Sequence, residues 1–314
     1  MMIYLDFEKP VAALEARILE LQAAAQESDI DADVEIAKLR GKADKQLADT
    51  YANLTAWQKT QVARHPERPH FKHYIASMFE DFMPLAGDRA FGDDQAIIGG
   101  LARLHGRRVM VIGHEKGDDT QSRLRHNFGM GKPEGYRKAI RLMELADRFA
   151  IPVVSLVDTS GAFPGIQAEE RGQAEAIARS TEACLALGVP MIACIVGEGG
   201  SGGAVALAAA DRILMFQYAV YSVISPEGCA SILWRTGDKA ADAAQAMKMT
   251  ADDLKSLRII DRIVKEPVGG AHRDHALAAA TLASAIHEEL EALSAFSAKE
   301  LVQQRRTKFL SMGA

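Results

Sequence analysis

The stretch that decides the fold is PMIACIVGEGGSGGA, residues 190–204. The apolar run at 191–196 is typical of a buried strand, and the alanine-rich run at 204–210 is typical of a helix. Between them, five glycines occur within the seven residues 197–203. Glycine costs backbone entropy on folding, so this density needs a geometric reason, which is typically the close approach of backbone N–H groups to an anion at a helix N-terminus.

A second unit of the same kind precedes this one. A helical pattern at 135–149 leads into an apolar strand at 152–158 and then into the loop TSGAFPG, residues 159–165. The helical pattern at 174–187 leads in the same way into the strand at 191–196, and the prolines that open the two strands are 38 residues apart. Ligands gather at the C-terminal ends of parallel strands, so both loops are predicted to face one cavity of an α/β protein.

Ahead of this body, residues 10–62 are predicted to be helical, because apolar residues recur at helical spacing and glycine is nearly absent. The segment RHPERP at 64–69 has two prolines in four residues and marks a boundary. We therefore expect a helical N-terminal arm at 1–63 and a main domain at 64–314. The same patterns predict strands at 106–114, 213–216 and 221–224, helices at 240–260 and 276–293, and a basic C-terminal tail.

The composition excludes several classes of protein. The chain of 314 residues has 37 Lys and Arg against 42 Asp and Glu, and a net charge of −5 argues against a protein that coats nucleic acid. Cys184, Cys194 and Cys229 form no CxxC pair, so no structural zinc is expected in this chain. Neither a signal peptide nor a membrane-spanning run is evident, and we expect a cytoplasmic protein.

The glycine loop also fits two unrelated motifs. Gly197, Gly199 and Gly202 match a dinucleotide-binding fingerprint, but the region about 20 residues further on, at 217–221, has no acidic residue for a ribose, and the next acid is Glu227. Ser201 is flanked as in the nucleophile elbow of serine hydrolases. Its partners in a triad could be drawn from four residues of the C-terminal region: Asp261, His272, Asp274 and His275.

A third interpretation is an oxyanion site formed by backbone N–H groups, which needs glycines rather than particular side chains. The candidate donors are Gly199, Gly200, Gly202 and Gly203 in the second loop, with Gly161 and Ala162 in the first. Two such sites in one cavity suit a reaction in which two carbonyl-type oxygens both become anionic. Tight packing alone is expected to explain one or two of the glycines, not five.

Five longer motifs resemble the alpha subunits of bacterial acetyl-CoA carboxylase carboxyltransferases. They are GYRKA at 135–139, DTSGAFPG at 158–165, AEERGQ at 168–173, GEGGSGGA at 197–204 and YSVISPEGCA at 221–230. The similarity extends over nearly the whole chain, from LDFE at 5–8 to GGAHR at 269–273. The chain has Ser160 and Phe163 where the family usually has Pro and Tyr, and neither departure removes a backbone donor.

The resemblance implies a crotonase-like α/β fold, a spiral of repeated ββα units with an N-terminal helical extension. It implies transfer of a carboxyl group from carboxybiotin, held on a biotin carboxyl carrier protein, to acetyl-CoA, which gives malonyl-CoA for fatty acid synthesis. The implied partners are a beta subunit that carries a zinc ribbon, in an α2β2 tetramer, and biotin carboxylase in the full ATP-dependent complex.

The resemblance also assigns the ureido oxygen of biotin to the glycine loops and leaves the thioester oxygen mainly to the partner. The residues expected at carboxybiotin are Gly161, Ala162, Phe163, Gly202 and Gly203. A stand-alone crotonase-type acyl-CoA enzyme and a serine hydrolase that uses Ser201 are the alternatives. A basic run is interpreted as a solvated helix face or as a contact for CoA phosphates or an acidic carrier: Arg123, Arg125, Lys132, Arg137, Lys138 and Arg141.

Overall fold

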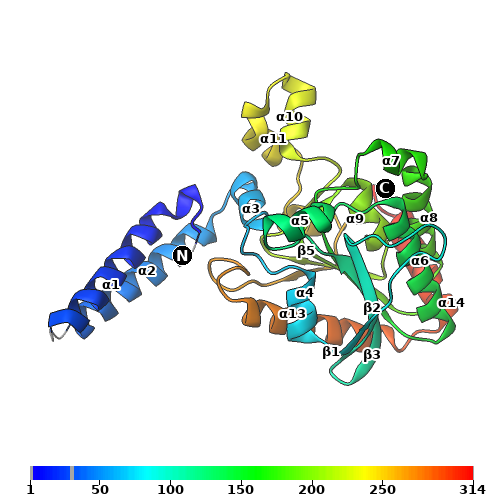
Figure 1. Ribbon diagram of the computed structural model, residues 1–314, viewed down its shortest axis with the longest axis horizontal. Coiled ribbons are helices and arrows are strands. Elements are labelled where there is room, and N and C mark those ends of the chain that lie inside the picture. The colour runs from blue at the N-terminus through cyan, green and yellow to red at the C-terminus, as the bar shows by residue number, and fades with distance from the viewer. Residues whose placement is uncertain (1–2, 29–31, 314) are drawn as a thin grey trace.

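The computed structural model describes residues 3–28 and 32–313, in which a two-helix arm stands out from a mixed α/β body (Figure 1). Within these residues, strands form one sheet in the order β1-β2-β3-β4-β5-β6-β8, with β7 paired to β5. The strands are β1 (Glu80–Pro84), β2 (Ile97–Leu104), β3 (Arg107–His114), β4 (Val153–Thr159), β5 (Met191–Gly200), β6 (Arg212–Phe216), β7 (Val220–Ser222) and β8 (Arg262–Val264).

The predicted repeat is confirmed by the register of β4 and β5. These strands are parallel neighbours, and Val153 pairs with Met191, 38 residues later, as do the next four pairs up to Val157 and Ile195. The following pair joins Thr159 to Gly199, so β5 contains two extra residues at this point. The bulge breaks the ladder just before the glycine loop and turns the strand toward α9 (Ser201–Ala208).

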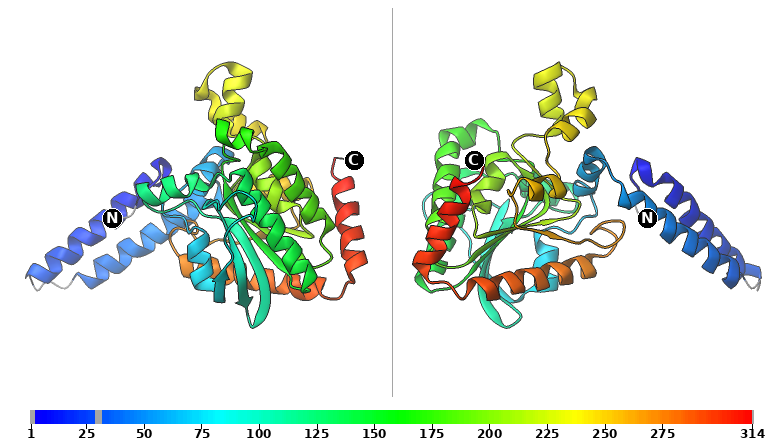
Figure 2. Two further views of the ribbon diagram at one scale, coloured as in Figure 1. Left: turned by 45° about the vertical axis from the view of Figure 1, so that its right-hand side comes forward. Right: turned by 180° about the vertical axis from the view of Figure 1, so that it is seen from behind.

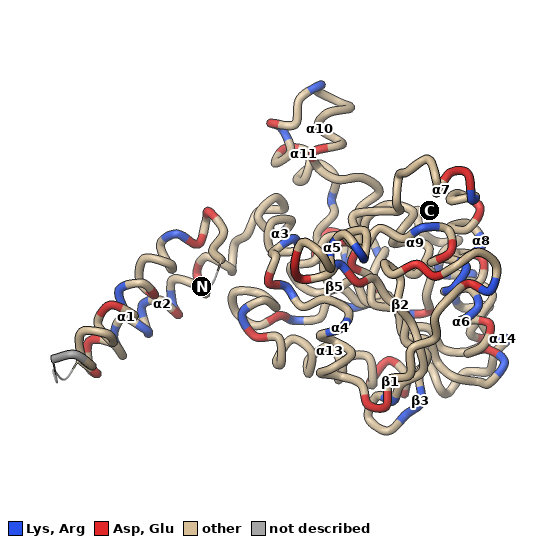
Figure 3. The backbone as a smooth tube through the Cα atoms, in the orientation of Figure 1, with Lys and Arg blue, Asp and Glu red and all other residues tan. Residues whose placement is uncertain are grey.

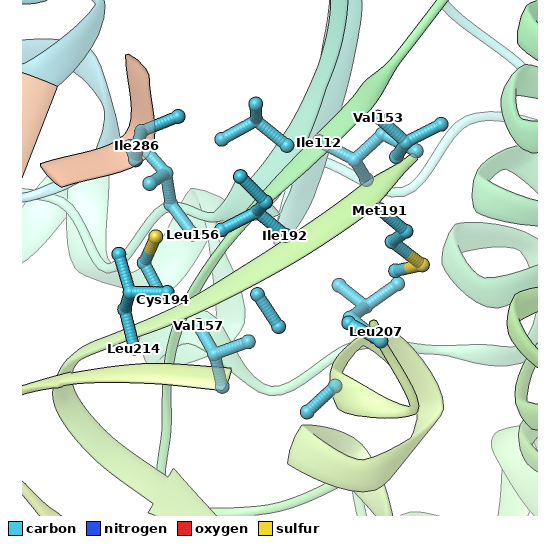
Figure 4. Packing of buried hydrophobic residues seen from close by; sticks show 14 of the residues in the cluster. Ile112, Val153, Leu156, Val157, Met191, Ile192, Cys194, Leu207, Leu214 and Ile286 are labelled. Carbon is cyan, nitrogen blue, oxygen red and sulfur yellow. The ribbon is translucent and has the colours of Figure 1, made fainter. Parts of the chain in front are cut away.

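Helices cover both faces of the sheet. On one side lie α6 (Pro133–Arg148), α8 (Gln173–Ala186) and α9, and on the other lie α4 (Phe71–Met78) and α13 (His275–Leu293) (Figure 2). Figure 4 shows Leu207 of α9 and Ile286 of α13 on opposite sides of the buried β4 and β5 side chains. Both central strands are therefore fully buried, and only their C-terminal ends open toward ligand.

The predicted helical stretch at 10–62 divides into α1 (Lys9–Ser28), α2 (Asp33–Ala52) and α3 (Ala56–Ala63). Lys and Arg are interspersed with Asp and Glu along the arm of α1 and α2 (Figure 3). Its base is tied to the body by Arg273, whose guanidinium lies 3.3 Å from Glu8 and 2.9 Å from Glu15. The arm therefore has a fixed root, although its length extends away from the sheet (Figure 1).

The predicted basic tail is wrong, because the chain ends in a helix, α14 (Ala298–Leu310), that packs on α8. Arg305 of α14 is fully buried and forms an ion pair with Asp211 at 2.7 Å. Its guanidinium also donates to the carbonyls that end α8 and follow it, at Cys184, Leu187 and Val189. A buried cation is thus the cap of a helix C-terminus, where cations are stabilising.

The remaining helices border the C-terminal ends of the strands or the sheet edge. They are α5 (Thr120–Arg125), α7 (Ile166–Glu170), α10 (Pro226–Trp234), α11 (Ala240–Ala246) and α12 (Ala251–Ser256), with short 3₁₀ turns at Asp6–Glu8, Asn127–Gly129 and Gly237–Lys239. The helix predicted at 240–260 is therefore two helices. None of the helices described is long and apolar enough to cross a membrane.

Candidate active site

The first loop leaves β4 at Thr159 and is shaped by that side chain. Gly161 has φ of +150°, a conformation that favours glycine. Its N–H donates to Thr159 Oγ1 at 3.1 Å, and the Phe163 N–H donates to the Gly131 carbonyl at 3.0 Å. The N–H of Gly161, which the sequence analysis named as a donor, therefore already has an acceptor within the loop. The Ala162 N–H has no acceptor among the described residues and is one donor that this loop offers.

The second loop divides its glycines between a strand and a helix. Gly199 and Gly200 are the last residues of β5 and pair with Tyr221 and Ser222 of β7. Gly202 lies in the first turn of α9 with Gly203, where N–H groups have no acceptor within the helix. The helix dipole adds positive potential at this end. Of the four donors predicted here, the two in α9 are thus the ones at a helix N-terminus.

The two loops touch through their backbones. A Cβ at Gly203 would lie 2.7 Å from the Gly161 carbonyl carbon and 2.8 Å from the Ala162 nitrogen, and one at Gly200 would overlap the Ser160 carbonyl. The Ala162 nitrogen therefore lies next to the N-terminus of α9, and the two loops are in contact.

Packing explains more of the glycines than the sequence suggested. A Cβ at Gly199 would meet the Tyr221 ring at 2.7 Å, and one at Gly197 would overlap the Asp158 carboxylate. Four of the five glycines thus have a close neighbour, whereas the added Cβ at Gly202 would meet nothing nearer than Ile177 Cγ2 at 3.4 Å.

Gln173 holds the first loop from below, a role that the sequence analysis missed. Its Nε2 donates to the carbonyls of Gly131 and Phe163, each at 2.9 Å, and the residue is 6% exposed. The Lys132 ammonium lies 5.0 Å from the centre of the Phe163 ring, within reach of a cation–π contact. The ring at Phe163 is therefore a neighbour of the site, although its N–H is already used.

Charged side chains lie directly beside the loops. Lys116 Nζ is 2.6 Å from Asp158 Oδ1 and 3.3 Å from Glu198 Oε2, and Arg64 Nε is 2.6 Å from Glu198 Oε1. Burial raises the pKa of the Asp158 carboxyl, but the Lys116 ammonium and His70 outweigh burial and hold this pKa well below its usual range.

A cavity of about 230 Å³ opens over this charged group. It reaches the first loop at Ser160 and the second at Glu198, but the glycines of α9 do not line it. Both loops were predicted to face a single cavity. In the structure each loop reaches this cavity only at its edge, through Ser160 or Glu198.

The candidate triad of a serine hydrolase is not assembled. Ser201 begins α9 with φ of +52°, yet its hydroxyl has no histidine partner among the described residues. Both ring nitrogens of His272 lack a partner, and its ring stacks on another imidazole, while His275 Nε2 contacts a backbone carbonyl. Asp274 caps α13 and Asp261 binds a lysine. The hydrolase interpretation thus loses its base and its orienting acid.

Three of the six residues of the basic run neither form a solvated helix face nor remain free to contact a phosphate: Arg137, Lys138 and Arg141. Lys138 is 3% exposed and binds Asp93 at 2.5 Å, and Arg137 binds Asp88 at 3.1 Å. Arg141 donates to backbone carbonyls at 85–87. These three side chains of α6 therefore secure the loop between β1 and β2.

Known proteins match this chain over nearly its whole length. Residues 4–313 match the family model described as acetyl co-enzyme A carboxylase carboxyltransferase-like. Acetyl-coenzyme A carboxylase carboxyl transferase subunit alpha of Rhizorhabdus wittichii is 72% identical over 313 residues, covering 100% of both chains. The subunit of the same name from Sphingopyxis alaskensis is 70% identical, covering 100% of this chain and 99% of that one.

Solved structures share the fold at low identity. Transcarboxylase 12S aligns with a TM-score of 0.60 and 21% sequence identity, covering 73% of this chain and 42% of its own. A Pseudomonas malonate decarboxylase hetero-tetramer aligns with a TM-score of 0.57 and 18% sequence identity, covering 68% of this chain and 86% of its own. The expected crotonase-like fold is therefore confirmed. The family model matches nearly the whole chain, and the two relatives are 72% and 70% identical to it. This chain therefore belongs to the family of carboxyltransferase alpha subunits of acetyl-CoA carboxylase.

Proposed function

We propose that this subunit transfers the carboxyl group of carboxybiotin, carried on a biotin carboxyl carrier protein, to acetyl-CoA, which forms malonyl-CoA for fatty acid synthesis. The observation that carries the proposal is the close contact of the first loop with the N-terminus of α9, where a Cβ at Gly203 would lie 2.8 Å from the Ala162 nitrogen. Backbone N–H donors stabilise negative charge on oxygen as it develops, without a proton transfer of their own.

The donor set fits the ureido oxygen of biotin, because a flat oxygen-bearing ring needs a cradle without side chains. Gly200 and Gly203 let the two loops approach each other closely, since a Cβ at either position would meet the first loop. Carboxybiotin supplies the carboxyl group and, after that group has left, the base that acts on acetyl-CoA. This chain positions the oxygen with Ala162, Gly202 and Gly203, while Gln173 keeps the first loop in place.

A partner chain completes the site in this proposal. Apolar side chains near α10 are exposed without cover from this chain: Val223, Ile232 and Leu233 are 79%, 70% and 63% exposed. Figure 1 shows α10 and α11 standing away from the sheet beside the site. We assign this surface to a beta subunit with a zinc ribbon, in an α2β2 tetramer that works with biotin carboxylase. The substrates arise inside the cell, so we place the reaction in the cytoplasm.

The test is a titration of the purified chain with purified beta subunit, with malonyl-CoA formation from carboxybiotin and acetyl-CoA followed together with particle mass. We expect no turnover from this chain alone, and activity that rises with a species of α2β2 mass. Full activity from the chain alone would instead favour a stand-alone crotonase-type acyl-CoA enzyme.

A further inference from the structure

The bulge in β5 is held by side chains where the strand ladder stops. Between the pairs Val157–Ile195 and Thr159–Gly199, the backbone of 196–198 is out of register with β4. The Glu198 N–H donates instead to Asp158 Oδ1 at 2.9 Å. The Val196 carbonyl accepts from Arg68 Nε at 2.7 Å. Buried backbone groups require partners, so these two side chains determine the path of the strand into the donor loop.

Lys116 joins the two loops at this point. Its ammonium bridges Asp158, which precedes the first loop, and Glu198, which lies in the second. Asp158 is 2% exposed and Gly197 is required to admit its carboxylate against β5. Because Asp158 and Glu198 both lie within 3.3 Å of the Lys116 ammonium, their carboxylates would repel each other without this cation between them. Burial lowers the pKa of Lys116, but the two carboxylates outweigh it and the net shift is upward.

Arg64 holds Glu198 from the other side. Its Nε binds Glu198 Oε1 at 2.6 Å, and its Nη1 binds Glu227 in the first turn of α10 at 2.5 Å. Each oxygen of the Glu198 carboxylate thus has its own cation. The side chain of the donor loop is fixed between Lys116 after β3 and Arg64 at the end of α3.

These cations are not an anion-binding site, although they line the cavity. Lys116 and Arg64 are paired as described, and Arg68 forms two bonds of 2.8 Å with Glu266. His70, which is 6% exposed and lacks a hydrogen-bond partner, faces Asp158 Oδ2 at 3.7 Å. Each of these four side chains therefore faces a carboxylate, and what they share is contact with the base of the donor loops.

We propose that Lys116, assisted by Arg64, is a positioning residue: it fixes the β5 bulge so that the N–H groups of Gly202 and Gly203 stay aligned with that of Ala162. The proposal rests on the proposed function for the meaning of that alignment. Displacing a catalytic group by about 1 Å costs on the order of 100-fold in rate. Loss of the bridge should therefore lower kcat by roughly 10- to 100-fold while the KM for acetyl-CoA changes little.

The test compares two buried ion pairs that are removed in the same way. Lys116→Met with Asp158→Asn removes the bridge without leaving a buried charge alone, and Arg305→Met with Asp211→Asn does the same far from the loops. Both variants are assembled with beta subunit, and kcat, KM and melting temperature are measured. We expect a loss of kcat only in the first pair, with most of it recovered in Lys116→Arg. Equal kcat in both variants would overturn the proposal.

A readout independent of turnover is amide hydrogen exchange over 197–203 in the isolated chain. Exchange should become faster in Lys116→Met with Asp158→Asn and stay unchanged in the Arg305 pair. If exchange were unchanged in Lys116→Met with Asp158→Asn, the positioning role of Lys116 would be contradicted, even if that variant failed to assemble with beta subunit. Absence of malonyl-CoA formation by the wild-type assembly would refute the proposed function instead, and exchange would still decide the role of Lys116.

Discussion

Adding one methyl group to Gly203 should strongly reduce catalysis, whereas the same change at the adjacent Gly202 should have little effect. In Gly203→Ala, the new Cβ would lie 2.7 Å from a backbone carbon of Gly161, roughly 1 Å inside the usual separation of about 3.5–4.0 Å. Backbone atoms cannot turn aside as the end of a side chain can, so α9 and the first loop must separate. Such overpacking costs about 1–3 kcal/mol of stability.

The separation also removes a donor from the oxyanion site. One lost donor typically costs about 3 kcal/mol in the transition state, so kcat should fall about 100- to 1,000-fold. Gly202→Ala is the matched control, because its Cβ would make an ordinary 3.4 Å contact with Ile177 and its N–H is unchanged. Its kcat should stay within about 3-fold of wild type, since that factor corresponds to less than about 0.7 kcal/mol.

Initial rates of malonyl-CoA formation by the assembly with beta subunit, together with melting temperatures, test the pair. Gly203→Ala with wild-type kcat and melting temperature would refute the argument from contact between the loops. A 100-fold loss in Gly202→Ala would show that the helix terminus depends on something other than its N–H groups.

Three further variants test other parts of the structure. Ser201→Ala should keep most of the turnover and the chain should not react with serine-directed acylating probes; probe labelling with a loss of several orders of magnitude would restore the hydrolase. Arg305→Met leaves Asp211 buried and unpaired and should lower the free energy of unfolding by about 3–5 kcal/mol in urea titrations, with a loss below about 1 kcal/mol contradicting the cap. Burial, with nearby His65 and Arg68, lowers the pKa of His272 to about 2, so the unfolded chain binds the extra proton first. Stability should therefore fall as the pH drops below about 6.5, by up to ~1.4 kcal/mol per pH unit from this group. His272→Gln should flatten that slope, and the exposed control His105→Gln should not; equal slopes would reject the assignment.

The parts of the fold that were predicted are those in which sequence pattern and packing coincide. The repeat of helix, strand and glycine loop predicted the register of β4 and β5, because the paired segments 153–157 and 191–195 are almost entirely apolar and buried. Strand β1 is mostly exposed. In β2, a Cβ at Gly99 would overlap the Leu142 side chain, and one at Gly100 would overlap the Met83 carbonyl. β1 thus carries no hydrophobic signal, and the two glycines interrupt the apolar residues of β2, so both strands were missed.

The polar C-terminal helix was missed for a related reason. In α14, Leu301 and Arg305 are the buried side chains, so no apolar face marks it. Its capping box, Ser297 with Glu300, was the available signal. The donor loops were predicted because their chemistry lies in consecutive residues. Their supports were not, since Lys116 and Arg64 reach Glu198 from 82 and 134 residues away.

The buried guanidinium of Arg305 also makes the order of synthesis matter. The chain emerges from its N-terminus, and most domains fold as units once enough of them is available. Here the last carbonyls of α8 and the carboxylate of Asp211 gain their partner only when residue 305 has been made. A chain cut short before α14 holds both glycine loops and the whole sheet, yet carries a buried negative charge without a counterion. Truncated copies should therefore be cleared as unfolded chains rather than enter the assembly as inactive subunits.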